Sequence, residues 1–143
     1  MEEQYIPHVV IVGGGFAGLY AAKRLKRQPV HVTVLDRRNY HLFQPFLYQV
    51  ATAGLSPGDV TTPIRSLLRH QRNTTVLLAE AEFINLQQRY VLLTDGVQIS
   101  YDHLILTTGA RHSYFGHAPH PRTQAIEAGV QNTFEEYRTK IEN

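Results

Sequence analysis

The sequence predicts an α/β fold in which a parallel sheet is combined with a small antiparallel β-meander. Three observations support this prediction. An apolar run at residues 9–12 leads through a glycine-rich turn into a helical pattern, and a second apolar run at 30–35 follows that helix. From residue 75 onward, several short β-type runs come close together, with a turn at Asp95-Gly96. Strands that alternate with helices indicate parallel pairing, whereas closely spaced runs joined by tight turns indicate antiparallel pairing.

A glycine-rich turn connects the first apolar run to the first helical pattern. Gly13, Gly15 and Gly18 stand in the spacing G-x-G-x-x-G. In this spacing the first glycine makes the turn, the second lets a pyrophosphate approach the backbone, and the third packs the helix against the strand. The amides and the dipole at the start of the helix favour an anion there. The turn therefore predicts a Rossmann-like dinucleotide site.

An acidic residue, Asp36, ends the second apolar run. Its carboxylate is placed to accept hydrogen bonds from the ribose hydroxyls of an adenosine. Arg37 and Arg38 would suit the 2′-phosphate of NADP, but that phosphate would meet the like charge of Asp36. The pattern therefore favours FAD or NAD.

Two helices, besides a short one in the aromatic segment, are expected in the first half of the chain. The first covers residues 16–27 and is ended by Pro29, because proline does not continue a helix. Thr62 is expected to cap the second helix, with Pro63 in its first position. Between them, residues 39–51 are unusually aromatic and predict a loop with a short helix. Their rings either cover the sheet or wall off a flat ring system.

After the second helix, the sequence pattern changes to short strands. We expect a parallel strand at 76–79, an antiparallel meander over 82–99, and a short buried strand at 104–106. The last strand leads into the small residues 107–110, Thr-Thr-Gly-Ala. Ligands of parallel sheets lie beyond the carboxyl ends of the strands, so this turn is expected beside the dinucleotide.

Composition excludes several other classes of protein. The chain has 143 residues, enough for one domain with a core, and it is 43% hydrophobic and 18% charged with a net charge of +2. That small charge does not favour nucleic acid, and no apolar run reaches the roughly twenty residues of a transmembrane helix. There is no cysteine. His112, His117 and His120 are interpreted as a solvated loop rather than a metal site, and a cytoplasmic location is expected.

Three segments, at residues 9–19, 36–55 and 101–116, together carry a family resemblance. They resemble the type II NADH dehydrogenases, the non-proton-pumping NADH:quinone oxidoreductases of the pyridine nucleotide-disulfide oxidoreductase superfamily. The middle segment is more specific than the glycine turn. The resemblance implies FAD as cofactor and NADH as co-substrate of the full-length proteins, which are peripheral on the cytoplasmic side of the membrane. The lack of cysteine separates the chain from the disulfide reductases of the superfamily.

The resemblance also implies which residues meet the cofactor. The glycine turn would hold the pyrophosphate, Asp36 the ribose, the backbone near Ala81 the adenine, and Asn39 to Gln49 the flavin side. His41 in that segment would either tune the isoalloxazine ring of the flavin or only pack against its neighbours in the protein. The expected cofactor-binding residues are Gly13, Gly15, Phe16, Ala17, Gly18, Asp36, Arg37, Asn39, Gln44, Gln49, Ala81, Thr108 and Gly109.

Two parts of the chain are expected to differ in role. Residues 1–117 would form the FAD-binding domain, and 118–143 a proline-containing loop followed by an amphipathic helical tail. The family's second glycine fingerprint, which binds NADH, is not found in the sequence, so the chain alone is expected to be inactive and to hold FAD weakly or not at all. It would need an NADH-binding half, or associate with itself through the tail helix. The alternative is a non-catalytic dinucleotide-binding module that assembles with another chain.

Overall fold

The computed structural model describes residues 5–38 and 40–109, which belong to two compact units. Among the described residues, the first unit comprises 5–38, 40–41 and 63–109, and the second comprises 42–62. The predicted tail helix, the histidine loop at 112–120 and the domain boundary at 117 lie outside the described residues. They stay predictions.

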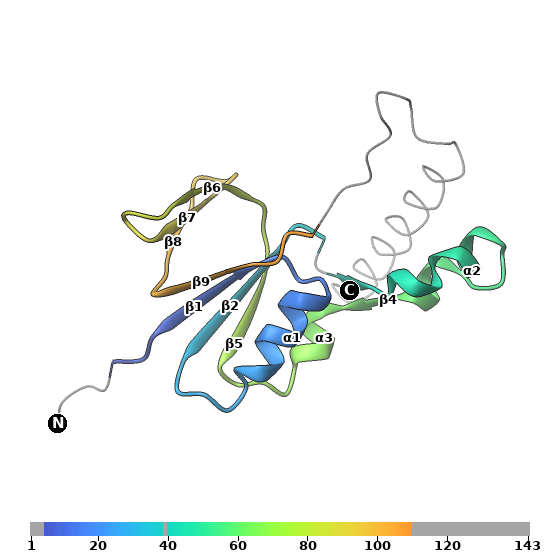
Figure 1. The fold of residues 1–143 in the computed structure, drawn as a ribbon, viewed down its shortest axis with the longest axis horizontal. Helices are drawn as coiled ribbons and strands as arrows, with labels where there is room; N and C mark the ends of the chain where they lie inside the picture. The colour runs from blue at the N-terminus through green and yellow to red at the C-terminus, as the bar shows by residue number, and fades with distance from the viewer. Residues whose placement is uncertain (1–4, 39, 110–143) are drawn as a thin grey trace, which may run out of the picture. The chain divides into compact units, whose positions relative to one another are not determined.

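A four-stranded parallel sheet forms the centre of the first unit (Figure 1). Its strands are β1 (His8–Val12), β2 (His31–Asp36), β5 (Thr74–Leu78) and β9 (His103–Leu106), in the spatial order β5-β2-β1-β9. All three pairings are parallel. The predicted parallel sheet is therefore confirmed, and the carboxyl ends of all four strands share one edge.

Both faces of this sheet are covered, which explains why its central strands are apolar almost throughout. On β1, Val9 and Ile11 pack in the cluster that contains Leu19 of α1 (Phe16–Arg24) and Ile64 of α3 (Ile64–Leu68). Val10 and Val12 belong to a second cluster with residues of the meander. The alternation of side chains along a strand thus places helices on one face and the meander on the other.

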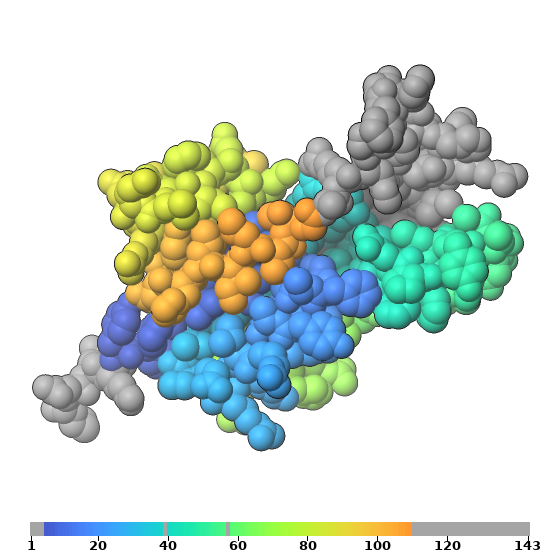
Figure 2. Space-filling view, in the orientation of Figure 1, coloured from blue at the N-terminus to red at the C-terminus, as the bar shows by residue number. Residues whose placement is uncertain are grey.

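The antiparallel meander is formed by β6 (Ala81–Asn85), β7 (Tyr90–Leu93) and β8 (Gln98–Ser100). Its two pairings are antiparallel, as predicted. In the space-filling view it is the yellow-green layer beside the orange β9 (Figure 2). The turn between β7 and β8 uses Gly96 at φ +85, and Asp95 accepts a hydrogen bond from the Val97 amide at 3.0 Å.

Helix α1 ends at Arg24, three residues before the predicted end at Arg27. The reason lies in a distant side chain. The amide nitrogen of Asn73 donates to the carbonyls of Leu25 at 2.9 Å and Val30 at 3.0 Å. The backbone amide of Gln28 also donates to the Leu25 carbonyl, at 3.0 Å. Together these bonds satisfy the carbonyls after α1, so the chain turns into β2 without a further helical turn.

The start of α3 also differs from the prediction. The helix begins at Ile64, and Pro63 is its N-cap with φ −56 and ψ 130. That extended ψ excludes Pro63 from the first turn, so Thr62 is not the cap. Both residues instead belong to the short strand β4 (Thr61–Pro63), which pairs with β3 (Tyr40–Leu42). This two-stranded sheet was not predicted, because strands of three residues show no readable alternation.

The second unit contains most of the aromatic segment. Its described residues form the helices η1 (Gln44–Phe46), α2 (Leu47–Ala51) and η2 (Pro57–Val60), so the predicted short helix is confirmed. Ser56 and Asp59 form a capping box at the start of η2. Among the described residues, no helix is long and apolar enough to cross a membrane.

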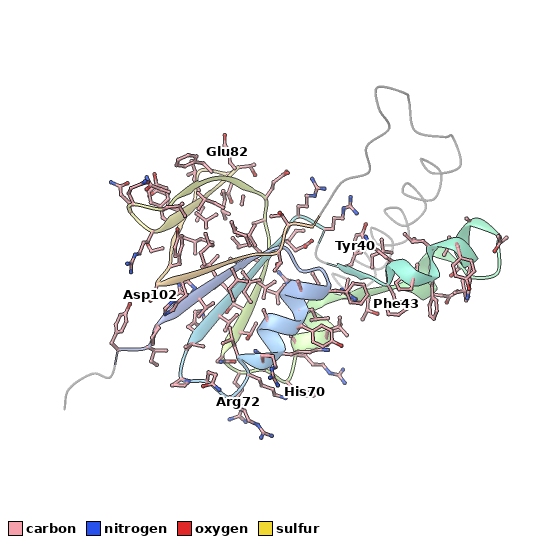
Figure 3. The ribbon with its side chains drawn as sticks, viewed as in Figure 1. Tyr40, Phe43, His70, Arg72, Glu82 and Asp102 are labelled. Carbon is pink, nitrogen blue, oxygen red and sulfur yellow. The ribbon has the colours of Figure 1, made fainter. Side chains whose placement is uncertain are left out.

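The amino edge of the parallel sheet holds a cluster of titratable groups. Asp102, labelled in Figure 3, precedes β9 and accepts a hydrogen bond from the His8 amide at 2.6 Å and one from the Tyr5 hydroxyl. The His8 ring bonds the Thr33 hydroxyl at 2.8 Å and lies 5.1 Å from the ring of His31. Burial, followed by the neighbouring His31, lowers the pKa of His8. This edge is opposite to the one where the glycine turn lies.

Candidate dinucleotide site

The carboxyl edge of the parallel sheet gathers the predicted site residues of the first unit. The glycine turn follows β1, Asp36 ends β2, Ala81 comes shortly after β5, and Thr108-Gly109 follow β9. Four segments far apart in the sequence therefore meet at one edge. Parallel sheets bind ligands at this edge.

Gly13 and Gly18 are fixed by backbone packing. Gly13 has φ +103, and a Cβ there would lie 2.3 Å from the carbonyl oxygen of Thr107. A Cβ at Gly18, in the first turn of α1, would lie 1.9 Å from the carbonyl oxygen of Gly13. Only glycine lets the turn touch the end of β9 on one side and α1 on the other.

Gly15 is different, because no described residue other than its own chain neighbours lies within 4 Å of the position of its Cβ. It is the N-cap of α1 with an ordinary extended backbone, and no described side chain caps the helix. The first turn, which contains Phe16 and Ala17, carries no acidic residue. The open space at the start of α1 is therefore suited to a ligand, and the helix terminus favours an anionic one.

Asp36 binds the turn directly. One carboxylate oxygen, Oδ2, accepts a hydrogen bond from the Gly14 amide at 2.7 Å, and Oδ1 accepts one from the Arg38 amide at 2.7 Å. These bonds hold the glycine turn at the end of β2. Since each carboxylate oxygen accepts more than one hydrogen bond, this role is compatible with a ribose contact.

Two further predicted residues lie near this edge in the first unit. Arg37 forms an ion pair with Glu80 at 3.7 Å, and both side chains are about half exposed, at 43% and 55%. Such a pair contributes little to stability. Ala81 opens β6 and pairs with Leu93. The cofactor contacts assigned to both residues stay predictions.

The remaining predicted residues are not placed with this site. Gln44 and Gln49 belong to the second unit, where Gln49 donates to the Tyr48 hydroxyl at 3.0 Å. Asn39 lies outside the described residues. Of the aromatic residues in this segment, Tyr40 is buried, whereas Phe46 and Tyr48 are exposed. The choice between a covering and a flavin-lining role stays open for the exposed rings.

Sequence reasoning missed two residues that shape the turn. A Cβ at Gly14 would lie 2.2 Å from Cδ1 of the buried Ile64, so this variable position of the fingerprint is also restricted. The Thr107 hydroxyl donates to the Gly13 carbonyl at 2.7 Å, and its amide donates to Val12 at 2.9 Å. The run of three glycines was a signal for the first residue. Thr107 was expected in the turn beside the dinucleotide, but no local signal indicated that its hydroxyl holds the glycine turn.

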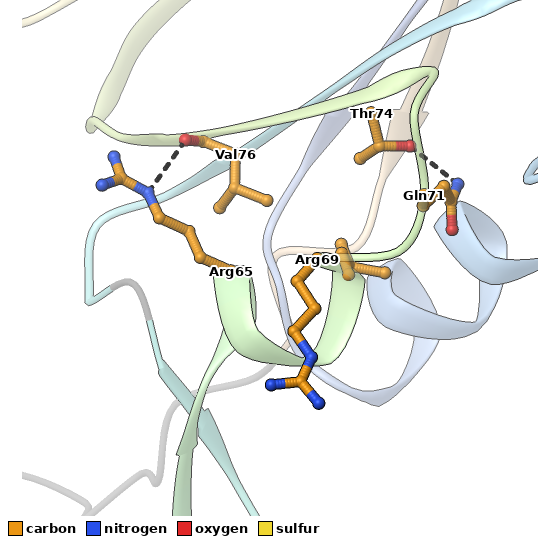
Figure 4. Close-up of a pocket in the computed structure, with 6 residues that line it drawn as sticks. Arg65, Arg69, Gln71, Thr74 and Val76 are labelled. Carbon is orange, nitrogen blue, oxygen red and sulfur yellow. Dashed lines mark hydrogen bonds between the residues drawn. The ribbon is translucent and has the colours of Figure 1, made fainter.

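A shallow hollow between α3 and β5 lies among Arg65, Arg69, Gln71, Thr74 and Val76 (Figure 4). Arg65 donates to the Val76 carbonyl at 3.3 Å, and Gln71 donates to the Thr74 hydroxyl at 2.7 Å. Its volume of about 160 Å³ is below the roughly 300–1,000 Å³ of small-molecule sites. None of these residues was predicted to bind the cofactor.

The fold, with its glycine turn and acidic strand end, is typical of the Rossmann-like dinucleotide-binding domains. The sequence pattern of the pyridine nucleotide-disulphide oxidoreductases matches residues 7–139, and the chain belongs to this family. It is 50% identical over 111 residues to the type II NADH:quinone oxidoreductases Ndh and NdhA of Mycobacterium tuberculosis, an alignment that covers 76% of this chain and 24% of each relative. The resemblance to type II NADH dehydrogenases is confirmed.

Solved structures support the Rossmann-like fold. The sulfide:quinone oxidoreductase of Aquifex aeolicus matches with a TM-score of 0.73 at 25% identity, over 93% of this chain and 32% of that one. NDH2 of Plasmodium falciparum in complex with NADH matches with a TM-score of 0.71 at 24% identity, over 78% of this chain and 24% of that one. The chain spans about a quarter of the length of the Mycobacterium relatives. The Mycobacterium relatives are NADH:quinone oxidoreductases, so NADH and a quinone are the substrates of those proteins.

Proposed function

We propose that this chain supplies the FAD-binding part of an NADH:quinone oxidoreductase. The observation that carries the proposal is the open space at Gly15, at the start of α1 and next to a turn that Asp36 holds in place. A pyrophosphate that approaches the backbone at the start of a helix needs this space. The 50% identity to type II NADH:quinone oxidoreductases supports the same function.

Different residues at the carboxyl edge would contact different parts of FAD. Amides at the start of α1 would bind the pyrophosphate, and Asp36 would accept hydrogen bonds from the adenosine ribose. Thr108-Gly109 and the backbone at Ala81 would border the pyrophosphate and the adenine. The bound flavin supplies the electron-transfer chemistry between NADH and quinone, while the protein binds and orients it.

Asp36 also decides which dinucleotide fits. Its carboxylate ends β2 beside the turn, so a 2′-phosphate on the ribose would meet a like charge. A ribose with two free hydroxyls, as in FAD, has the matching donors. Asp36→Ala should weaken FAD by about tenfold to a hundredfold, because charge-assisted hydrogen bonds contribute about 1.5–3 kcal/mol.

NADH and quinone would be bound by protein outside this sequence. The sequence contains one glycine fingerprint, and its relatives are about four times longer than the region that matches. We expect the chain alone to have no NADH:quinone activity, because hydride transfer requires the nicotinamide to be held close to the flavin. We expect it to bind FAD weakly but measurably, because the carboxyl edge of the sheet supplies the contacts to the pyrophosphate and the ribose. In the full-length protein, a peripheral position on the cytoplasmic side of the membrane would bring the flavin near its quinone acceptor.

Gly15→Val tests the site, because it would place a branched side chain in the open space. FAD titration, followed by quenching of flavin fluorescence, should show an affinity at least a hundredfold lower than that of the parent. Tyr20→Val is the matched control, since it puts the same residue on an exposed position of α1. Equal FAD affinity in the parent and in Gly15→Val would overturn the proposed site.

A further inference from the structure

One buried histidine lacks a hydrogen-bond partner in the protein. His41 is 9% exposed, and its Nδ1 is the one buried side-chain nitrogen or oxygen without a partner among the residues that the structure describes. Buried polar atoms in native proteins are nearly always hydrogen-bonded, because an unpartnered one destabilises the fold. A role confined to packing would be performed better by an apolar ring of similar size.

The position of this imidazole connects it with the glycine turn. Its ring packs edge-to-face against Phe16, with the ring centroids 4.6 Å apart and an angle of 83° between the planes. Phe16 is the first residue of α1 and directly follows Gly15, where the protein leaves open space. His41 is therefore held one aromatic ring away from the residue at which we place the pyrophosphate.

We propose that His41 is a cofactor-contacting residue, whose Nδ1 donates its missing hydrogen bond to an oxygen of bound FAD. The inference rests on the proposed function. FAD offers oxygens that accept hydrogen bonds along its pyrophosphate and ribityl chain, and a neutral imidazole protonated on Nδ1 is a donor for them. The edge-to-face contact with Phe16 restricts the ring orientation, so the hydrogen bond would also fix the position of the cofactor along the turn.

Two substitutions separate a contact from packing. His41→Phe keeps an aromatic ring and removes the polar atom, so the cofactor-free protein should unfold at the same or a higher denaturant concentration than the parent. Its FAD dissociation constant should rise about tenfold, which corresponds to the loss of one hydrogen bond. His41→Asn places an amide nitrogen near the position of Nδ1, and its dissociation constant should stay within about threefold of the parent value.

Stability and FAD affinity are measured on the same preparations of the parent, the two His41 variants and Gly15→Val. The contact is supported if His41→Phe is at least as stable as the parent but binds FAD more weakly. Unchanged affinity in His41→Phe overturns it, and so do parallel losses of stability and affinity in both His41 variants. If Gly15→Val loses FAD while His41→Phe binds it normally, only this inference fails. If the parent binds no FAD, the proposed function fails as well.

Discussion

Gly18→Ala and Gly15→Ala make the same chemical change at the two ends of one turn of α1 and should have opposite consequences. The alanine Cβ at Gly18 would lie 1.9 Å from the Gly13 carbonyl oxygen and 2.7 Å from the Thr107 hydroxyl. That hydroxyl already donates to the same carbonyl at 2.7 Å. The helix must therefore move away from the turn, or the hydrogen bond must break.

The magnitude follows from three contributions. Overpacking costs about 1–3 kcal/mol, and losing the partly buried hydrogen bond from the Thr107 hydroxyl costs about 0.5–1.5 kcal/mol. The higher helix propensity of alanine offsets about 1 kcal/mol of this destabilisation. Allowing for partial relaxation, Gly18→Ala should lower the free energy of unfolding by about 1–3 kcal/mol. Gly15→Ala, with no atom within 4 Å, should leave it unchanged within about 0.5 kcal/mol and weaken FAD binding.

Urea unfolding of the cofactor-free variants measures this difference in stability. Unfolding is monitored by far-ultraviolet circular dichroism, because the chain has no tryptophan whose fluorescence could report it. FAD titration of Gly15→Ala then measures the second effect. A Gly18→Ala protein as stable as the parent would contradict the close contact between α1 and the turn. If Gly15→Ala lost as much stability as Gly18→Ala, the space beside Gly15 would not be open.

Three further predictions concern the support of the site and of the sheet. Gly14→Ala should lower the free energy of unfolding, because its Cβ would meet the side chain of Ile64. Adding Ile64→Val should restore part of this loss. Purely additive effects in a double-mutant cycle would argue against the contact. Asn73→Ala should lower the free energy of unfolding in urea by about 1–3 kcal/mol, because it removes two hydrogen bonds to the carbonyls of Leu25 and Val30, each worth about 0.5–1.5 kcal/mol. It should not change FAD affinity, and a large change in affinity would show that the effect reaches the turn. Burial and the neighbouring His31 lower the pKa of His8 below its ordinary value of 6.5. The unfolded chain therefore binds a proton at His8 more readily than the folded chain does. The free energy of unfolding should be highest above pH 6.5 and should decrease as the pH falls below that value. His8→Gln should flatten this dependence, and an equal slope in parent and variant would assign it to other groups.

The sequence was sufficient to predict the β1–α1–β2 unit, because its information is local. The apolar strand, the glycine spacing and the acidic strand end occur within about thirty residues, the length of a βαβ unit. The meander was also predictable, because Asp95-Gly96 is a local turn signal. These elements place most of the candidate site.

The features that were missed depend on contacts between distant residues. The end of α1 is set by Asn73, and the restriction at Gly14 comes from Ile64. The role of Thr107 becomes visible only when β9 lies beside β1. Neither hydrophobic periodicity nor helix propensity contains this information, so such residues are found from packing and hydrogen bonds.

The central claim is that FAD binds at the start of α1, and an NMR titration of the ¹⁵N-labelled chain with FAD tests it most directly. This measurement detects weak as well as tight binding and reports its location. The account predicts saturable shifts that gather at the amides of Gly15 and Ala17, near Asp36, and at Thr108-Gly109. Amide shifts confined to other surfaces, such as the hollow beside Arg65, or an unchanged spectrum at saturating FAD would contradict it.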